Sequence, residues 1–370
     1  MKLAVRELRR RPGRFAAATM TLLLISMLLM FLGGLADGLI SNSTGAVRAQ
    51  QVDLLVFSSD AKDSFLRSRI DANLRSRIQA VPGVGTTGGI GIIQLGARVP
   101  GRGPRDLADT ALFGYEIAPK GVAATPPPLG QVYADDVLKS KGITNGMTIE
   151  LGAYRSPVTI IGFVSDTAYL GQGALWGSIA TWRKVAADNK SVQALAEGSF
   201  QSLVVKATGS VEATRSAIDQ ATVGATATLT IAEAANAIPG VKEQRATFNQ
   251  IIGATIVIAL VVVALFFALL TVERTALYGV LKAIGASSAT LFAGVVAQAV
   301  VVTLVAALGA ALLSFALDAL IPPGSIPFAL SFGRVLSSAA FLLLAAIVGC
   351  AFSLRRVLRI DPASAIGGAL

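Results

Sequence analysis

Histidine is missing from this 370-residue chain, and cysteine occurs once, at Cys350. The lack of imidazole excludes histidine-dependent metal sites and Ser-His-Asp catalysis, and a single cysteine cannot form an internal disulfide. Charged residues are also scarce, at 15% of the chain, against about 25% in an average soluble protein. The composition therefore excludes several enzyme classes and argues against a soluble protein.

Hydrophobic residues are abundant instead, at 53% of the chain, and the mean hydropathy is +0.65. A helix needs about 20 apolar residues to cross a hydrocarbon core of roughly 30 Å. Four uncharged windows reach that length: Phe15–Ala36, Phe248–Val272, Ala283–Leu317 and Val335–Leu354. We therefore predict an integral membrane protein with four transmembrane helices.

The excess of positive charge, +10 overall, lies beside these windows. Residues 1–14 contain six basic residues and one acidic residue, and Arg355, Arg356 and Arg359 follow the last window, whereas residues 37–247 hold 20 basic and 18 acidic residues. Basic residues next to membrane spans mark the cytoplasmic side. We expect both termini and the loop after the second span to be cytoplasmic, residues 37–247 to lie outside, and no nucleic-acid binding.

The first window has an alternative interpretation as a cleaved signal peptide. The apolar part of such a peptide is about 7–15 residues long and ends at a small-residue cleavage site. Here the uncharged run from Phe15 to Ala36 is longer than that. We expect this segment to be retained as a membrane anchor.

Between the first two windows the pattern changes to short runs. Alternating or β-branched runs indicate strands, and apolar residues at helical spacing indicate helices. Strands are expected at Val52–Phe57, Ile90–Val99, Thr110–Glu116, Met147–Leu151, Val158–Val164 and Leu203–Ala207, and helices at Asp71–Val81, Asp135–Ser140, Ser178–Asp188 and Val211–Gln220. The predicted fold class is an α-helical membrane domain plus an extracytoplasmic α+β domain inserted between helices 1 and 2.

Three stretches predict connections in that region. Gly83–Gly88 satisfies the dinucleotide pattern G-x-G-x-x-G, but a helical pattern precedes it and a β-like run follows, so a turn is expected. Thr125–Leu129, with three consecutive prolines, predicts a surface linker that divides the outer domain. Ile231–Arg245 predicts a helical stalk, interrupted at Pro239-Gly240, that continues into the second span.

The sequence offers no catalytic or energy-converting motif. It contains no G-x-x-x-x-G-K-[ST] loop and no Gly-Lys dipeptide, so any ATP must be bound by a separate subunit. Asp135 and Asp136 are adjacent on an expected helix, which favours a solvated face or an N-terminal helix charge over acid–base catalysis. The four windows contain no charged side chain, which argues against ion-coupled transport.

Residues 273–287 form a short polar interruption between two long apolar runs. Apolar residues recur at helical spacing inside it: Leu277, Val280, Leu281 and Ile284. Gly279 and Gly285 allow close contacts or a sharp exit from a helix. We predict a short amphipathic helix at the cytoplasmic face that serves as a docking element.

One face of the first span is a second candidate site. Met27, Met30, Phe31 and Gly34 recur at helical spacing on that face, and Gly34 with Gly38 forms a small-xxx-small pair that lets helices approach closely in lipid. Ordinary packing or contact with lipid is one interpretation. A dimer seam, or the wall of a hydrophobic cargo cavity, is the other.

The polar interruption also resembles a known family. Glu273-Arg274-Thr275 and Gly279–Ser287 are similar to the E-R-T-R-E-I-G-V-L-R-A-L-G-A-S signature of FtsX-like, MacB-type ABC transporter permeases. Ile360–Ala365, which reads I-D-P-A-S-A, resembles the closing R-x-D-P-x-x-A pattern, and Gly142–Val164 resembles the paired strands of the outer domain. The chain departs at Ala276-Leu277-Tyr278, where the family usually has Arg, Glu and Ile. Its short length resembles the haem-exporter and DevC-like branches.

This resemblance implies a permease with no ATPase site of its own. It would form a homodimer and couple to an ABC ATPase subunit, which binds ATP and Mg, through Glu273, Arg274, Gly279, Val280, Leu281, Lys282 and Gly285. No cofactor is expected on this chain, and haem is one expected cargo. The implied function is ATP-driven efflux or mechanotransmission of a hydrophobic or amphipathic cargo such as haem, a peptide, a lipid or a drug.

Two alternatives remain open. A non-transporting regulator would pass ATPase motion to an extracytoplasmic partner such as a cell-wall hydrolase. A membrane-anchored outer enzyme would need a catalytic constellation, which the sequence does not supply.

The expected layout is that of a multi-pass protein of the bacterial cytoplasmic membrane. It comprises a basic N-terminus (1–14), TM1 (15–36), the extracytoplasmic domain and stalk (37–247), TM2 (248–272), the coupling helix (273–287), TM3 (289–317), an external loop (318–334), TM4 (335–354) and a cytoplasmic tail (355–370).

Overall fold

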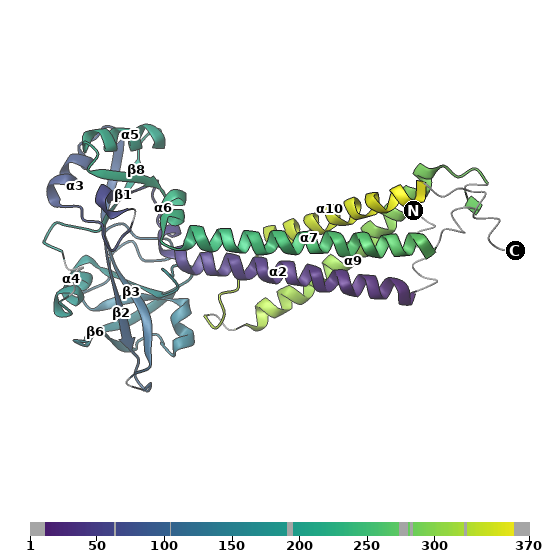
Figure 1. Ribbon diagram of the computed structural model, residues 1–370. Helices are drawn as coiled ribbons and strands as arrows, with labels where there is room; N and C mark the ends of the chain where they lie inside the picture. The colour runs from purple at the N-terminus through teal and green to yellow at the C-terminus, as the bar shows by residue number, and fades with distance from the viewer. Residues whose placement is uncertain are drawn as a thin grey trace. The chain divides into compact units, whose positions relative to one another are not determined.

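The structure is a computed structural model that describes residues 12–62, 64–103, 105–190, 195–273, 280–281, 284–321 and 324–358. The chain divides into two units (Figure 1). The α/β unit comprises residues 38–245 and 321–327. The helical unit comprises the residues up to 37, residues 246–320 and the residues from 328 onward.

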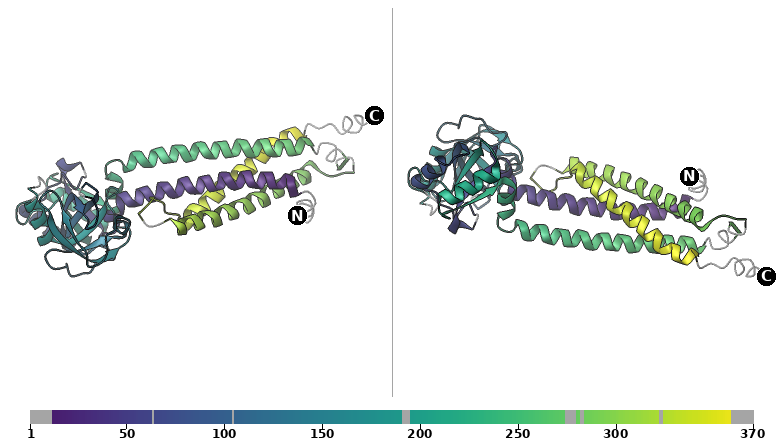
Figure 2. Two further views of the ribbon diagram at one scale, coloured as in Figure 1. Left: turned by 90° about the horizontal axis from the view of Figure 1, so that it is seen from below. Right: turned by 90° about the horizontal axis from the view of Figure 1, so that it is seen from above.

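Four long helices make up the helical unit: α2 (Pro12–Arg48), α7 (Val241–Glu273), α9 (Ser288–Leu320) and α10 (Phe332–Leu358). They run alongside one another in every view (Figures 1 and 2). Each contains a stretch long and apolar enough to cross a membrane: Ala16–Arg48, Val241–Phe266, Ala289–Leu320 and Phe332–Ala351. Helix α2 continues past the expected end of the first span, and its last turns belong to the α/β unit.

Small residues line the contacts between these helices. Ala299, Ala306 and Ala346 are fully buried, and such residues let helices approach closely where dispersion drives association. Larger apolar side chains, such as Leu29 and Val263, fill the remaining space in the same cluster. The bundle therefore has its own core within one copy of the chain.

A nine-stranded sheet forms the centre of the α/β unit, in the order β3-β7-β4-β6-β5-β2-β8-β1-β9. The strands are β1 (Leu54–Ser58), β2 (Val84–Arg98), β3 (Leu107–Tyr115), β4 (Gln131–Asp135), β5 (Thr148–Leu151), β6 (Ser156–Val164), β7 (Gly173–Ser178), β8 (Ser202–Ala207) and β9 (Thr226–Thr230). Strand β2 also pairs with β3, which closes six strands into a ring. The long β2 makes this possible, because its first part pairs with β8 and its second part with β3.

Short helices cover the sheet: α3 (Ala72–Gln79), α4 (Ile179–Asp188), α5 (Val211–Ala221) and α6 (Ile231–Ala237), with 3-10 helices η1 (Ser59–Ala61) and η2 (Asp136–Lys141). Asp71, Ser178 and Ser210 cap α3, α4 and α5, because each side chain accepts the N–H of the residue three positions later. The structure thus confirms four membrane-length helices with an α/β domain between the first and second.

Two predictions for this unit are wrong. Gly83–Gly88 turns only at Gly83 and then belongs to β2, where Gly89 leaves room for the ring of Phe200 that any larger side chain would overlap. Thr125–Leu129 does not divide the domain, because the strands on both sides of it belong to one sheet. The helical stretch expected from Asp135 to Ser140 is present as the 3-10 helix η2, which follows the last residue of β4.

Candidate functional site

The loop between β6 and β7 grips the last turns of α2 within the α/β unit. Three backbone hydrogen bonds join them: Ala46 N to Ala168 O at 3.0 Å, Leu170 N to Ser43 O at 3.1 Å and Gly171 N to Asn42 O at 3.1 Å. Two of these bonds end on backbone carbonyl groups of α2, within its last two turns. A Cβ atom on Gly45 would lie only 2.8 Å from Asp166 O. The end of α2 is therefore held by the domain through its backbone.

An ion pair reinforces this grip. Arg48 donates from Nη2 to Asp166 Oδ1 at 2.5 Å and from Nη1 to Asp166 Oδ2 at 3.1 Å. Ser41 Oγ donates to the same carboxylate at 2.7 Å. The Arg48 and Asp166 side chains are 38% and 57% exposed, so solvent screening leaves this pair with about 0.2–1 kcal/mol of stabilisation. The ion pair mainly fixes how α2 is rotated about its own axis where it contacts the loop.

The gripping loop is itself anchored in the core. Tyr169 is buried among aromatic side chains and meets Phe65 and Phe113 edge-on, with ring centroids 5.9 and 5.6 Å away. Burial raises the pKa of its hydroxyl. Tyr169 therefore ties the loop that holds α2 to the centre of the domain.

Asp135 fixes the start of the same loop from the end of β4. Its side chain is 1% exposed, and Oδ2 accepts the N–H of Thr167 at 2.8 Å and its hydroxyl at 2.6 Å. Oδ1 accepts the N–H of Val137 at 3.0 Å. Burial raises the pKa of Asp135 in spite of these hydrogen bonds. The predicted solvated face is thus wrong for this residue, whereas the alternative of an acid at a helix N-terminus is confirmed, because the carboxylate points inward and caps η2.

Helix α7 begins in the same core that receives α2. Ile238 and Val241 are buried there together with Ala46 and Val47 of α2. Helix α6 precedes it and starts with a capping box, in which Thr230 and Glu233 each accept the other's backbone N–H. The backbone N–H of Thr230, helped by Arg215, holds the pKa of Glu233 below its usual range. After Pro239-Gly240, α7 runs unbroken to Glu273.

The predicted face of the first span is largely covered within the helical unit. Met30 is completely buried, and Ser314 Oγ of α9 lies 4.0 Å from its sulfur. Phe31 stacks on Phe328 with ring centroids 5.5 Å apart, and Gly34 lies directly under the same ring. Met27 is half-buried. These contacts come from the same copy of the chain, and a role for the face in cargo binding or dimerisation stays a prediction.

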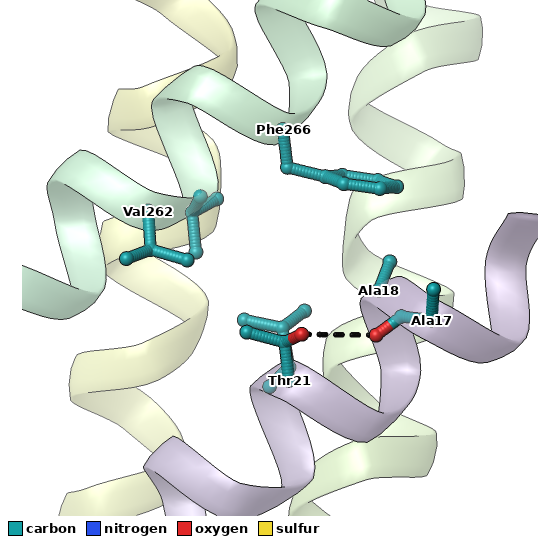
Figure 3. A pocket seen from close by; sticks show the side chains of 7 residues that line it. Ala17, Ala18, Thr21, Val262 and Phe266 are labelled. Atoms are coloured by element: carbon teal, nitrogen blue, oxygen red, sulfur yellow. Dashed lines mark hydrogen bonds between the residues drawn. The ribbon is translucent and has the colours of Figure 1, made fainter.

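An apolar cavity of about 140 Å³ opens between α2 and α7. Its lining consists of Ala17, Ala18, Thr21, Leu22, Val262, Val263 and Phe266 (Figure 3). The Thr21 hydroxyl donates back to Ala17 O at 3.0 Å, so even this side chain presents a mainly apolar surface. A cavity of roughly 150 Å³ holds a molecule the size of benzene, which is far smaller than haem. No sequence pattern indicates this cavity beyond the small residues at positions 17 and 18.

The predicted coupling segment is described in part. Glu273 ends α7, while Arg274, Gly279 and Lys282 lie outside the described residues. Val280 and Ile284 are 50% and 77% exposed, whereas Leu281 packs against the helical bundle.

A helix turn ends at Gly285, as the sharp exit expected there requires. Gly285 has φ +98°, and Ala286 N donates back to Leu281 O at 2.9 Å, which is the bond of a left-handed helix cap. Ser287 then caps α9 by accepting the N–H of Thr290 at 3.2 Å. The role of the segment in coupling stays a prediction.

The family assignment rests on the region around residues 273–287. Residues 249–362 match the FtsX-like permease C-terminal family. This part of the chain is an FtsX-like permease domain. The match begins in α7, contains α9 and α10, and confirms the family predicted from the loop and tail motifs. Together with the four apolar helices, it supports a multi-pass bacterial membrane protein.

Curated relatives match over a similar length. A protein of Staphylococcus haemolyticus named for a hemin transport system permease, HrtB, is 30% identical over 131 residues, which is 35% of this chain and 37% of that protein. A protein of Staphylococcus epidermidis with the same name is 25% identical over 131 residues, with the same coverage. The chain thus spans about a third of the length of these relatives.

Solved structures resemble the chain more weakly. The periplasmic region of MacB from Actinobacillus actinomycetemcomitans gives a TM-score of 0.36 at 11% identity, covering 51% of this chain and 94% of that one. The extracellular domain of the ABC-type transporter YknZ from Gram-positive bacteria gives a TM-score of 0.32 at 13% identity, covering 48% of this chain and 98% of that one.

Proposed function

We propose that the chain is the permease subunit of an ATP-driven ABC complex that moves a hydrophobic or amphipathic cargo outward from the membrane. The match of residues 249–362 to FtsX-like permeases supports this proposal. The observation that carries the mechanical part is that α2 and α7, both of membrane-spanning length, are rooted in one core of the α/β unit. Two such helices can transmit motion to that domain without a channel for the cargo.

The lengths of the helices suit this role. At a rise of about 1.5 Å per residue, the 33 residues of α7 extend over roughly 50 Å. A hydrocarbon core needs only about 30 Å. An unbroken helix of this length links the segment after Glu273 with the core of the α/β unit, so a movement at one end displaces the other.

A partner ATPase would act on residues 273–287. The exposed apolar side chains of Val280 and Ile284 lie on a turn whose other side, at Leu281, is packed on the bundle. A turn that is fixed on one side and apolar on the other suits docking into a groove of a partner protein. In the proposed complex this partner binds ATP and Mg, the permease forms a homodimer, and both permease termini are cytoplasmic.

Haem is the first cargo to test, because two relatives are named for hemin transport. The cavity between α2 and α7 is too small for haem, so the proposed cargo site lies on a surface of the helical unit or between copies. A regulator that moves an outer partner, such as a cell-wall hydrolase, is the second candidate. The burial of the end of α2 and the start of α7 in one core of the α/β unit supports this regulator equally, since transmission of motion needs no cargo.

The proposal is tested by co-expressing the chain with the ABC ATPase encoded beside it and purifying both in lipid nanodiscs. We expect a stable complex whose ATP hydrolysis rises when haem or another cargo is added, with the cargo identified by mass spectrometry. Ile284→Asp should abolish co-purification, whereas Leu129→Asp, at a residue of the α/β unit that is 58% exposed, should not. Failure to bind any ABC ATPase would overturn the proposal, and a complex that moves no cargo but retains an outer partner would favour the regulator.

A further inference from the structure

A charged pair joins α2 to the start of α10 within the helical unit. Arg334 donates from Nε to Asp37 Oδ2 at 2.9 Å and from Nη2 to Oδ1 at 2.5 Å. Both side chains are about one-third exposed, at 28% and 32%. This two-bond geometry between a guanidinium and a carboxylate fixes direction as well as distance.

The surface of α2 is shaped to receive this arginine. Gly33 lies one helical turn before Asp37, and a Cβ atom there would overlap Cδ and Nε of Arg334. Glycine lets the arginine stem cross α2 at this height, because that stem lies against the backbone of the helix. The pair is therefore built into the contact between the two helices.

The segment before α10 docks on the next residue of α2. Ala329 N donates to Gly34 O at 3.0 Å, and the ring of Phe328 covers Gly34 and stacks on Phe31. A backbone hydrogen bond, an aromatic stack and an ion pair thus converge within two turns of α2. We name this set of contacts, made by Phe31, Gly33, Gly34, Asp37, Phe328, Ala329 and Arg334, the α2–α10 clasp.

Helix α7 is less buried within the unit than the other three long helices. Only 11% of its most apolar window is buried, against 33% for α2, α9 and α10. Of the helices that lead into the α/β unit, α2 is clasped and α7 is loosely packed beside an apolar cavity.

The following inference rests on the proposed function. We propose that Asp37 and Arg334 are positioning residues that hold α2 and α10 together as a single moving body, against which α7 shifts. Helix α10 then moves together with α2 during the ATP-driven cycle. The small-residue face of α2 serves to receive α10 of its own chain.

The test measures the spacing of α2 and α10 directly. Spin labels are placed at Leu28 and Leu336, which are 47% and 61% exposed, in the full chain with Cys350→Ala, and pulsed electron spin resonance in nanodiscs records their distance distribution. We expect one narrow distribution that broadens in Asp37→Asn and in Arg334→Gln. The double variant should broaden no further than either single variant, because the two changes remove the same contact.

Asp318→Asn is the matched control, since it removes an acid from α9 and leaves the clasp intact. The proposal is overturned if the distribution is unchanged in both single variants, or if the effects of the two changes simply add. Either result would leave the pair as a surface contact. Partial restoration by Arg334→Lys, which keeps the charge but loses the two-bond geometry, would support it.

A second measurement separates this inference from the proposed function. In a complex with the ATPase, the α2–α10 distance should stay constant on addition of ATP and vanadate, while a label pair on α2 and α7, at Leu28 and Val257, should shift. An α2–α10 distance that changes as much as the α2–α7 distance would contradict a single moving body. Loss of ATPase binding would count against the proposed function alone, because the distances in the free permease test the clasp.

Discussion

The carboxylate of Asp135 accepts both the backbone N–H and the hydroxyl of Thr167, at 2.8 and 2.6 Å. Thr167 belongs to the loop that grips the end of α2. A buried acid on β4 thereby sets the position of the end of a membrane helix that lies almost 90 residues earlier in the chain. Four predictions follow from this and the other contacts.

Replacing Asp135 with alanine should loosen the grip on α2. The change removes the acceptor of three hydrogen bonds and leaves donors of Thr167 and Val137 buried without partners, which costs about 1–3 kcal/mol for each unsatisfied group. We expect the free energy of unfolding of the full chain, measured by denaturant titration, to fall by about 2–4 kcal/mol. The control is Asp136→Ala, which removes a side chain that is 33% exposed and pairs with Lys139, and which should cost under about 1 kcal/mol.

The raised pKa of Asp135 predicts how stability varies with pH. Because the folded state holds this proton more tightly than the unfolded state, protonation favours folding. The gain is fully present below the unfolded pKa and is lost as the pH rises through the higher folded pKa.

Asp135→Asn removes this titration. Denaturant titrations from pH 4 to pH 7 should therefore show wild type losing stability relative to the variant as the pH rises. A difference between the two proteins that stays constant over that range would contradict the assignment.

A larger residue in place of Gly45 should weaken the contact between α2 and the loop that joins β6 to β7. Its Cβ position lies within 2.9 Å of backbone atoms of Asp166 and Ala168, which cannot move as easily as a flexible side chain. We expect Gly45→Val to destabilise the α/β unit by about 1–3 kcal/mol and to speed hydrogen exchange in residues 165–172. Gly209→Ala, at a glycine with open space around it, should leave exchange in that loop unchanged.

Filling the cavity between α2 and α7 should raise the stability of the protein, whereas the changes at Asp135 and Gly45 lower it. Ala18→Val adds two methyl groups beside about 140 Å³ of apolar space, and each buried methyl contributes about 0.8 kcal/mol. We expect a higher melting temperature in nanodiscs. Ala299→Val makes the same change at a fully buried position of the bundle and should lower the melting temperature, because a well-packed site resists added volume.

The sequence predicted those parts of the fold that depend on local periodicity. The four apolar helices, strands such as Val158–Val164 and the helix after Ser178 follow from runs that are uniform in character over several residues. Strands β4, β7 and β9 were missed, because short runs such as Gly173–Ser178 contain glycine and serine and become strands only through their neighbours in the sheet. Glycines in β2 indicated a turn, yet they make room for side chains from distant segments.

The candidate site likewise has a part that the local sequence predicts and a part that it does not. The family was readable from the loop and tail motifs, since these are continuous in sequence. The pairing of Asp37 with Arg334 joins residues 297 positions apart, and Asp135 with Thr167 depends on which strand lies beside β4. Neither partner carries a motif, so only the three-dimensional structure reveals these contacts.

The core shared by Ala46, Val47, Ile238 and Val241 determines how the outer domain can be cut from the chain. A fragment limited to the sheet, from about residue 50 to residue 230, would lack these side chains and expose the apolar surface they cover. A fragment from Gly38 to Arg245 would keep them. The end of α2 and the beginning of α7 are therefore part of the hydrophobic interior of the domain, and a soluble version needs both helical ends.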